Sequence, residues 1–148
     1  MRVAKFDTST YLVRFERGEE LIESLTSFCE KHSIKNATVS AIGALEDPTL
    51  AHYSINTKKY SEKKLEGIYE VTGLNGNIAI FEGNIVPHCH VSLSDESMNA
   101  YGGHLIHGTV SATVEMTVVV YPTNFEKKMD AEIGIKLFDL PKENDDIA

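Results

Sequence analysis

The chain contains little arginine, and its charge is predominantly of the opposite sign. Its three arginines, Arg2, Arg14 and Arg17, all lie near the N-terminus. Proteins that bind nucleic acid usually carry a basic surface, because neutralisation of phosphates by Lys and Arg supplies most of the affinity. This 148-residue chain instead has 22 acidic and 14 basic residues, a formal net charge of −8. The charge therefore argues against duplex DNA as a partner, unless the fold gathers a local basic surface.

Cysteine and long apolar runs are also scarce. Two cysteines, Cys29 and Cys89, do not form a disulfide framework, which favours a reducing compartment. No run approaches the roughly 18 apolar residues of a membrane helix. Residues 1–20 lack the apolar core of a secretory signal. We therefore expect a cytoplasmic protein that does not enter the membrane.

The length suits one domain. A chain of 148 residues can bury about 70% of the surface that it exposes when unfolded. No repeat, linker or low-complexity tract divides it. We expect a single domain over residues 1–148, with an ordered core at about 11–140. The acidic tail 141–148 is expected to be disordered.

Alternating apolar and polar residues indicate that the chain is mostly β-strand. Residues 69–83 are expected to form a hairpin that turns at Asn75-Gly76, since this dipeptide favours the type I′ turn. Residues 58–65 are polar and fit either an edge strand or a loop. The other predicted strands are 10–16, 37–43, 49–55, 86–94, 104–122 and a closing strand, 132–140.

One helix is clear from the pattern. Leu21, Leu25 and Phe28 form an apolar stripe at helical spacing. Gly18 is a candidate N-cap, and the helix is expected to end near His32. One helix after the first strand, followed by strands with short connections, predicts an α+β fold built on an antiparallel sheet.

Three histidines on a predicted hairpin form the candidate metal site. In a strand, residues i and i+2 lie on one face with Cα atoms roughly 6.5–7 Å apart, so His88 and His90 point the same way and Cys89 points away. His104 follows two glycines, which permit close approach of the backbone, on the returning strand. Imidazole nitrogens bind zinc at about 2.0–2.1 Å. The spacing predicts that His88, His90 and His104 hold one divalent metal, with zinc the favoured ion, and leave a position open for water or ligand.

The remaining histidines fit ordinary structural roles. His107 lies three residues after His104, so strand alternation turns it to the opposite face. His32 and His52 are expected at a helix end and in a strand. A lone H-x-H pair is itself a weak signal, and it is the third histidine that favours a metal site.

Four lysines form the candidate basic surface. Lys58, Lys59, Lys63 and Lys64 lie close together, with Glu62 among them. The segment is a weak candidate for nucleic-acid binding. The alternative is a solvated loop or edge strand, which is the commoner role of such a run.

The chain resembles the plants-and-prokaryotes conserved (PPC) domain. The resemblance spans residues 11–139, and its most specific parts are the segments HCHVSLSD and YGGHLIHGTV. It implies a mixed, mainly antiparallel sheet flanked by helices, assembled as a homotrimer. In prokaryotic members the histidines that match His88, His90 and His104 are associated with a bound metal, usually zinc.

The resemblance also brings a DNA-binding expectation. Plant members carry AT-hooks with an R-G-R-P core, and standalone prokaryotic members are commonly described as predicted DNA-binding proteins. This chain has no R-G-R-P. The plant segment G-R-F-E-I-L is replaced here by residues 67–72, Gly-Ile-Tyr-Glu-Val-Thr, which lack the arginine. Partner contacts attributed to that motif are therefore not transferred to this chain, and the DNA-binding role is an analogy of fold.

Three functions remain open from the sequence. The first is a metal-dependent enzyme or binder of a small molecule, in which the metal activates a ligand or water. Glu115 is a candidate base in that reaction, although it also fits an exposed strand residue. The second is a DNA-binding regulator whose basic surface comes from repeated 58–64 segments in a trimer. The third is a sensor or assembly module in which the metal is structural or reports a ligand.

Overall fold

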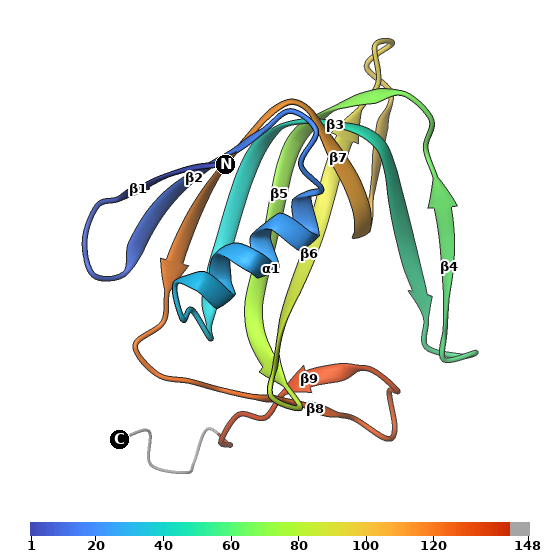
Figure 1. The fold of residues 1–148 in the computed structure, drawn as a ribbon. Coiled ribbons are helices and arrows are strands. Elements are labelled where there is room, and N and C mark those ends of the chain that lie inside the picture. The colour runs from blue at the N-terminus through green and yellow to red at the C-terminus, as the bar shows by residue number, and fades with distance from the viewer. Residues whose placement is uncertain (143–148) are drawn as a thin grey trace.

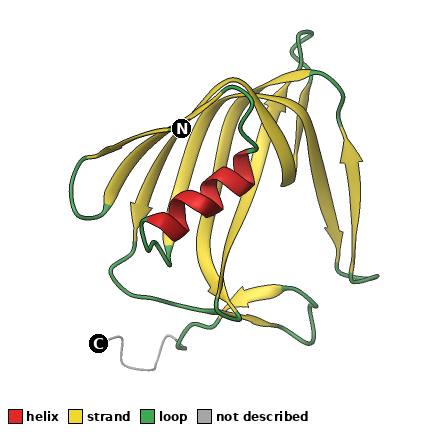
Figure 2. Ribbon diagram, viewed as in Figure 1, coloured by secondary structure: helices red, strands yellow, loops and turns green. Residues whose placement is uncertain are grey.

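The protein is built almost entirely of β-strands, with one helix (Figures 1 and 2). The structure, a computed structural model, describes residues 1–142. The elements are β1 Arg2–Lys5, β2 Thr10–Glu16, α1 Leu21–Lys31, β3 Ala37–Ser54, β4 Lys59–Lys64, β5 Ile68–Phe81, β6 Asn84–Ser94, β7 Ala100–Val120, β8 Lys127–Met129 and β9 Lys136–Phe138. Every ladder between these strands is antiparallel, so the predicted α+β class with a mainly antiparallel sheet is confirmed.

The main sheet has seven strands in the order β1-β2-β7-β6-β5-β3-β4. Strand β7 also pairs with β3, while its first residues pair with β6. The strands β3, β5, β6 and β7 therefore form a closed circuit of pairings rather than an open sheet. In Figure 1, β3 and β7 both bend over the upper edge of the molecule.

Two strands were predicted at 37–43 and 49–55, but β3 is one continuous strand of 18 residues. Its pairing with β7 shifts register around Gly43 and again between Glu46 and Leu50. A Cβ on Gly43 would lie 2.2 Å from the Thr113 carbonyl oxygen, so only glycine lets β7 approach here. Bulges bend a strand without ending it, and they tolerate the proline that follows Asp47.

The hairpin turn predicted at Asn75-Gly76 is wrong. Both residues lie inside β5, which pairs with β3 on one side and β6 on the other, and the turn falls instead at Glu82-Gly83. A Cβ on Gly76 would lie 2.4 Å from the His88 carbonyl oxygen. Gly76 is therefore required by the close approach of two backbones and not by a turn.

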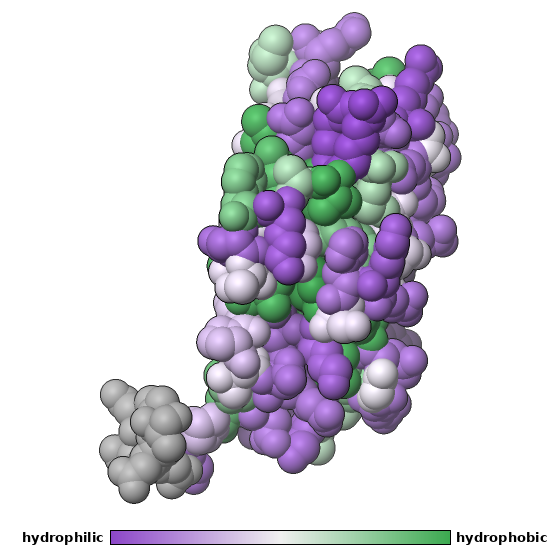
Figure 3. Space-filling view, turned by 60° about the vertical axis from the view of Figure 1, so that its left-hand side comes forward, coloured by the Kyte–Doolittle hydropathy of each residue, from purple (hydrophilic) through white to green (hydrophobic). Residues whose placement is uncertain are grey.

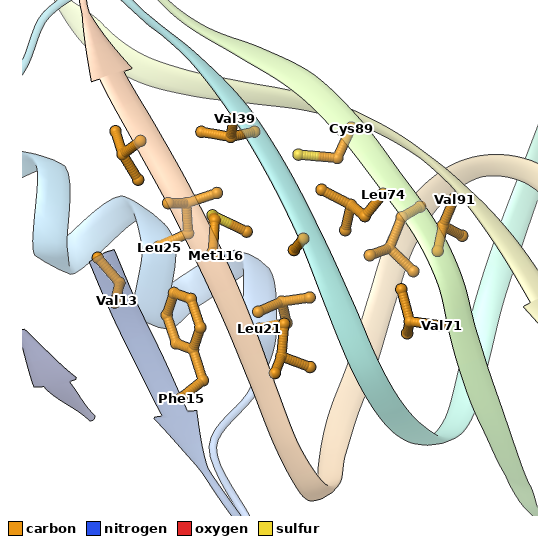
Figure 4. Close-up of a cluster of buried hydrophobic side chains, with 14 of the residues drawn as sticks. Val13, Phe15, Leu21, Leu25, Val39, Val71, Leu74, Cys89, Val91 and Met116 are labelled. Carbon is orange, nitrogen blue, oxygen red and sulfur yellow. The ribbon is translucent and has the colours of Figure 1, made fainter. Parts of the chain in front are cut away.

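The helix α1 covers the inner face of the sheet, where the core lies (Figures 1 and 4). Its N-cap is Glu20, two residues later than predicted, and the Glu20 carboxylate accepts a hydrogen bond from the Glu23 amide at 2.6 Å. The helix was predicted after the first strand, but it follows the second, because the short strand β1 precedes β2. In residues 1–142 no helix is long and apolar enough to cross a membrane. The core includes Val13, Phe15, Leu21, Leu25, Val39, Val71, Leu74, Cys89, Val91 and Met116.

The strand predicted at 132–140 does not close the main sheet. Only Lys136–Phe138 is strand, and it pairs with β8 as a separate two-stranded sheet at the lower end of β5 and β6 (Figure 1). Asp130 explains the difference, because its carboxylate accepts the amides of Glu132 and Ile133 and forms a tight turn. Most of the tail predicted as disordered, residues 143–148, lies outside the described part of the chain.

Candidate metal centre

The three candidate ligands lie on the outer face of the sheet, opposite the core and α1. His88 and His90 alternate with buried Cys89 on β6, as predicted, and His104 lies on β7. His90 pairs directly with His104, and His104 pairs with Ala51 of β3. Paired residues of an antiparallel ladder project to the same face. Strand register therefore brings together histidines that are 14 residues apart in the sequence.

The three imidazole rings converge. Their centroids are 5.1 Å apart for His88 and His90, 5.0 Å for His88 and His104, and 5.6 Å for His90 and His104. One nitrogen of each ring lies within 4.8 Å of the others. Two nitrogens on a tetrahedral zinc ion are about 3.3 Å apart, so the rings would turn toward one another to bind an ion.

Burial favours the neutral, metal-binding form of two of the rings, His88 and His104. Desolvation lowers the pKa of His88 to about 4, with further lowering by the nearby charges of Lys127, His104 and His90. The same causes, burial first, lower the pKa of His104. Neutral imidazoles are therefore favoured at neutral pH, and only the neutral ring offers a lone pair. Among the described residues, 1–142, the buried Nδ1 of His104 has no hydrogen-bond partner, so a divalent ion fits this donor set.

Glycine and asparagine lie behind the rings. A Cβ on Gly103 would lie 3.0 Å from the Ala51 carbonyl oxygen, in keeping with the close approach predicted for the glycines before His104. Asn77 pairs with His88 across β5 and β6, and its buried Oδ1 has no hydrogen-bond partner in the part of the chain that the structure describes. An acceptor at this position suits the N–H of a metal-bound imidazole.

The histidines line a pocket of about 700 Å³. One wall comes from the β3–β4 hairpin and the other from the β8–β9 hairpin. The Tyr53 hydroxyl joins the walls by donating to the Ile133 carbonyl at 2.7 Å, and the Lys58 ammonium donates to the Ala131 carbonyl at 2.9 Å. The pocket lining includes His88, His90, His104, Tyr53, Tyr60, Glu62, Lys127, Met129 and Lys136.

Two charged residues of this pocket, Glu62 and Lys127, were not predicted from the sequence as part of the site. Glu62 is the acidic residue of the lining, and its strand position pairs with Ala51, which in turn pairs with His104. Lys127 is 6% exposed, and burial together with the charge of Lys136 lowers its pKa. The alternation of Tyr60 and Glu62 was available as a signal. For Lys127, no local pattern distinguishes it from a surface lysine.

Glu115 does not reach this pocket. It is exposed on β7 and pairs with Arg14 and Ile42. Its role as a base is therefore not supported by the geometry. His107 faces away from the other rings as predicted, and its Nδ1 lies 3.2 Å from the Glu20 carboxylate.

The four lysines of the candidate basic surface lie along the exposed edge strand β4 and at its start. Lys58 is held by the Ala131 carbonyl, and Lys64 forms an ion pair with Asp47 at 2.9 Å. Lys59 and Lys63 share one face of β4, and Lys64 lies on the other. The four ammonium groups are therefore divided between the two faces of the strand and its end.

The chain is similar to a known family in sequence and to solved proteins in structure. The sequence model of the Plants and Prokaryotes Conserved domain (PCC or PPC domain) matches residues 3–122. The chain belongs to this family. No curated protein matches the chain.

Solved structures of similar proteins support the same PPC fold. A plant- and prokaryote-conserved protein from Pyrococcus horikoshii is 31% identical, with a TM-score of 0.84 and 95% of each chain covered. The metal-containing protein AF0104 from Archaeoglobus fulgidus is 29% identical, with a TM-score of 0.82, covering 93% of this chain and 99% of that one. A protein from Ralstonia eutropha described as a candidate DNA-binding protein is 28% identical, with a TM-score of 0.86 and coverage of 94% and 96%.

Proposed function

We propose that this PPC domain is a cytoplasmic metal-binding protein whose three-histidine centre binds or processes a small molecule. The convergence of His88, His90 and His104 at one pocket is the observation that carries the proposal. Three neutral nitrogen ligands leave at least one position on a tetrahedral ion for water or ligand. In catalytic zinc sites that open position is where chemistry occurs.

Zinc is the proposed metal. Imidazole suits zinc, copper, iron and nickel, whereas magnesium and calcium prefer oxygen ligands. The relative from Archaeoglobus fulgidus is named as metal-containing, which supports a metal here as well. The pocket of about 700 Å³ is in the size range of small-molecule sites.

Metal analysis of the purified protein tests the proposal. We expect one equivalent of zinc per chain by inductively coupled plasma mass spectrometry, and none in the triple variant His88→Ala, His90→Ala and His104→Ala. His107→Ala is the matched control, since His107 faces away and is expected to leave the metal in place. Full metal in the triple variant would refute the assignment.

The role of the metal is tested by chelation. Loss of turnover or small-molecule binding after chelation would support the proposed function. A lower melting temperature after chelation, without any loss of binding, would indicate a structural metal.

We further propose that the protein is a homotrimer. Apolar side chains remain exposed on the outer face of the sheet, including Ile42 at 62% and Val119 at 37%. Figure 3 shows hydrophobic side chains interspersed with hydrophilic ones on one side of the molecule. Exposed apolar side chains on a sheet face are the kind of surface that a second and third copy of the chain could cover. Light scattering should give about three times the chain mass of 16.4 kDa, and a monomer at micromolar concentration would contradict this.

DNA binding is the second candidate, favoured by the description of the Ralstonia eutropha relative. The net charge of −8 per chain opposes it, since such a field repels phosphates. We expect weak or no binding to duplex DNA in about 150 mM salt, where phosphate contacts are partly screened. Nanomolar binding that is lost on charge reversal of Lys59 and Lys63 would show that the regulator role is correct.

A further inference from the structure

The charge around the metal centre is opposite in sign to the charge of the chain. Lys127 and Lys136 line the same pocket as the histidines, and Glu62 is the acidic residue in that lining. A divalent ion at the histidines would add two further positive charges. Lys127, the buried lysine of this acidic chain's described residues, thus lies next to other positive charge.

The β8–β9 hairpin directs these lysines toward the pocket. Lys127 pairs with Phe138, and Met129 pairs with Lys136. Because residues i and i+2 and their cross-strand partners share a face, both lysines and Met129 point to one side. Lys128 lies between Lys127 and Met129 in β8, so its side chain is on the opposite, exposed side, where it forms an ion pair with Asp139.

Within residues 1–142, Lys127 has no acidic partner. Its side chain is 6% exposed, and its nitrogen lies 4.9 Å from the centre of the Phe138 ring. The nitrogen of Lys136 lies 4.4 Å from the centre of the Phe81 ring. Within residues 1–142 no carboxylate is within ion-pair distance of either nitrogen. A largely buried lysine without a counter-charge lowers the stability of the fold. An anionic ligand in the pocket would supply that counter-charge.

A rigid connection fixes the position of this lysine. Buried Asn36, just before β3, accepts a hydrogen bond from the Phe125 amide at 2.7 Å and donates to the Phe125 carbonyl at 2.9 Å. Phe125 is two residues before Lys127. The lysine is therefore held on the sheet before any ligand arrives, which lowers the entropic cost of binding.

We infer that the pocket takes a small anionic molecule, whose carboxylate or phosphate group is bound by Lys127 and Lys136 while the same molecule reaches the metal centre. This inference rests on the proposed function and specifies its ligand class. One oxyanion can neutralise the buried ammonium and occupy the open metal position, and charge-assisted hydrogen bonds are the strongest available to it. The aromatic and apolar side chains of Tyr60 and Met129 would contact the rest of the molecule.

Calorimetry with the zinc-loaded protein tests the inference. The probes are malonate for the carboxylate arm, methylphosphonate for the phosphate arm, and malonamide as the neutral equivalent of malonate. We expect at least one anion to bind and malonamide not to bind. In Lys127→Met the affinity for that anion should fall by about 30-fold or more, as for other buried charge pairs that lose a partner. Lys128→Met, on the opposite side of the same strand, should bind like the wild type.

The outcomes separate this inference from the proposed function. Equal anion affinity in the wild type and in Lys127→Met, with zinc present in both, would overturn the inference alone, as would a wild type that binds neither anion. Absence of zinc from the wild type would refute the metal centre, and anion titration of the same protein would still test the lysines. If Lys127→Met does not fold, Lys136→Met gives the same comparison. Preferential binding of a short DNA duplex, lost in the same variant, would overturn the inference in favour of nucleic-acid phosphate.

Discussion

Acid should destabilise the metal-free protein through His88. Burial and nearby positive charge lower the pKa of this ring to about 4 from an ordinary value of 6.5. The unfolded chain therefore binds a proton that the folded chain excludes between these two pH values. The stability that this ring contributes is complete above about pH 6.5 and is lost as the pH falls toward 4.

The magnitude follows from the two pKa values. Between pH 7.5 and pH 5 the full shift corresponds to about 2 kcal/mol of unfolding free energy. His88 is only half-buried, so solvent screening reduces the expected loss to about 1–2 kcal/mol.

The measurement is urea unfolding of the chelated protein at both pH values, at one fixed protein concentration, for the wild type and His88→Gln. Glutamine does not titrate, so the wild type should lose about 1–2 kcal/mol more than the variant on acidification. An equal loss in both proteins would refute the reasoning. The zinc-loaded wild type should lose more again, because protons displace the metal from the rings.

Three further predictions follow from other contacts. Asn36→Ala should lower the free energy of unfolding by about 2–4 kcal/mol, because both backbone groups of Phe125 lose a buried partner, and a change below about 0.5 kcal/mol in urea unfolding would contradict this. Gly76→Ala should reduce zinc content and cost about 1–3 kcal/mol, since the new Cβ would meet the β6 backbone, whereas Gly73→Ala has open space and should do neither; equal zinc in the two variants would disprove the argument. Burial raises the pKa of both cysteine thiols to about 12, so a disulfide reagent at pH 8 should label them only after unfolding, and rapid labelling of the native protein would show that the core is more open than described.

The parts of the fold that follow from local pattern were predictable. Strict alternation identified β2 and β6, and the apolar stripe with Leu25 at its centre identified the helix. The candidate ligands also came from alternation, because i and i+2 in β6 necessarily share a face. That they lie close to His104 was predicted from a hairpin, and β6 and β7 do pair at this point.

The parts that depend on distant segments were not predictable in the same way. Gly43 and Gly76 both look like breaks or turns in the sequence, yet each lies within a continuous strand where another backbone approaches closely. The short sheet formed by β8 and β9 depends on the turn at Asp130, which competes with a long strand. The burial of Lys127 results from packing against segments far away in the sequence, and nothing in its immediate neighbours records this.

The pairing of the metal-site strands has a consequence for the order of folding. The row that contains Glu62, Ala51, His104 and His90 crosses four neighbouring strands, and its members come from positions 51 to 104 of the chain. His104 joins His88 and His90 through the short β6–β7 hairpin, whereas the pairing of His104 with Ala51 of β3 spans more than 50 residues of chain. Such non-local pairings form late and slowly, because loop closure must precede the contacts. The β3–β4 wall of the pocket is therefore complete only in the finished sheet, and we expect the ion to be held most tightly there. Added zinc should slow unfolding of the native protein and leave the rate of refolding nearly unchanged.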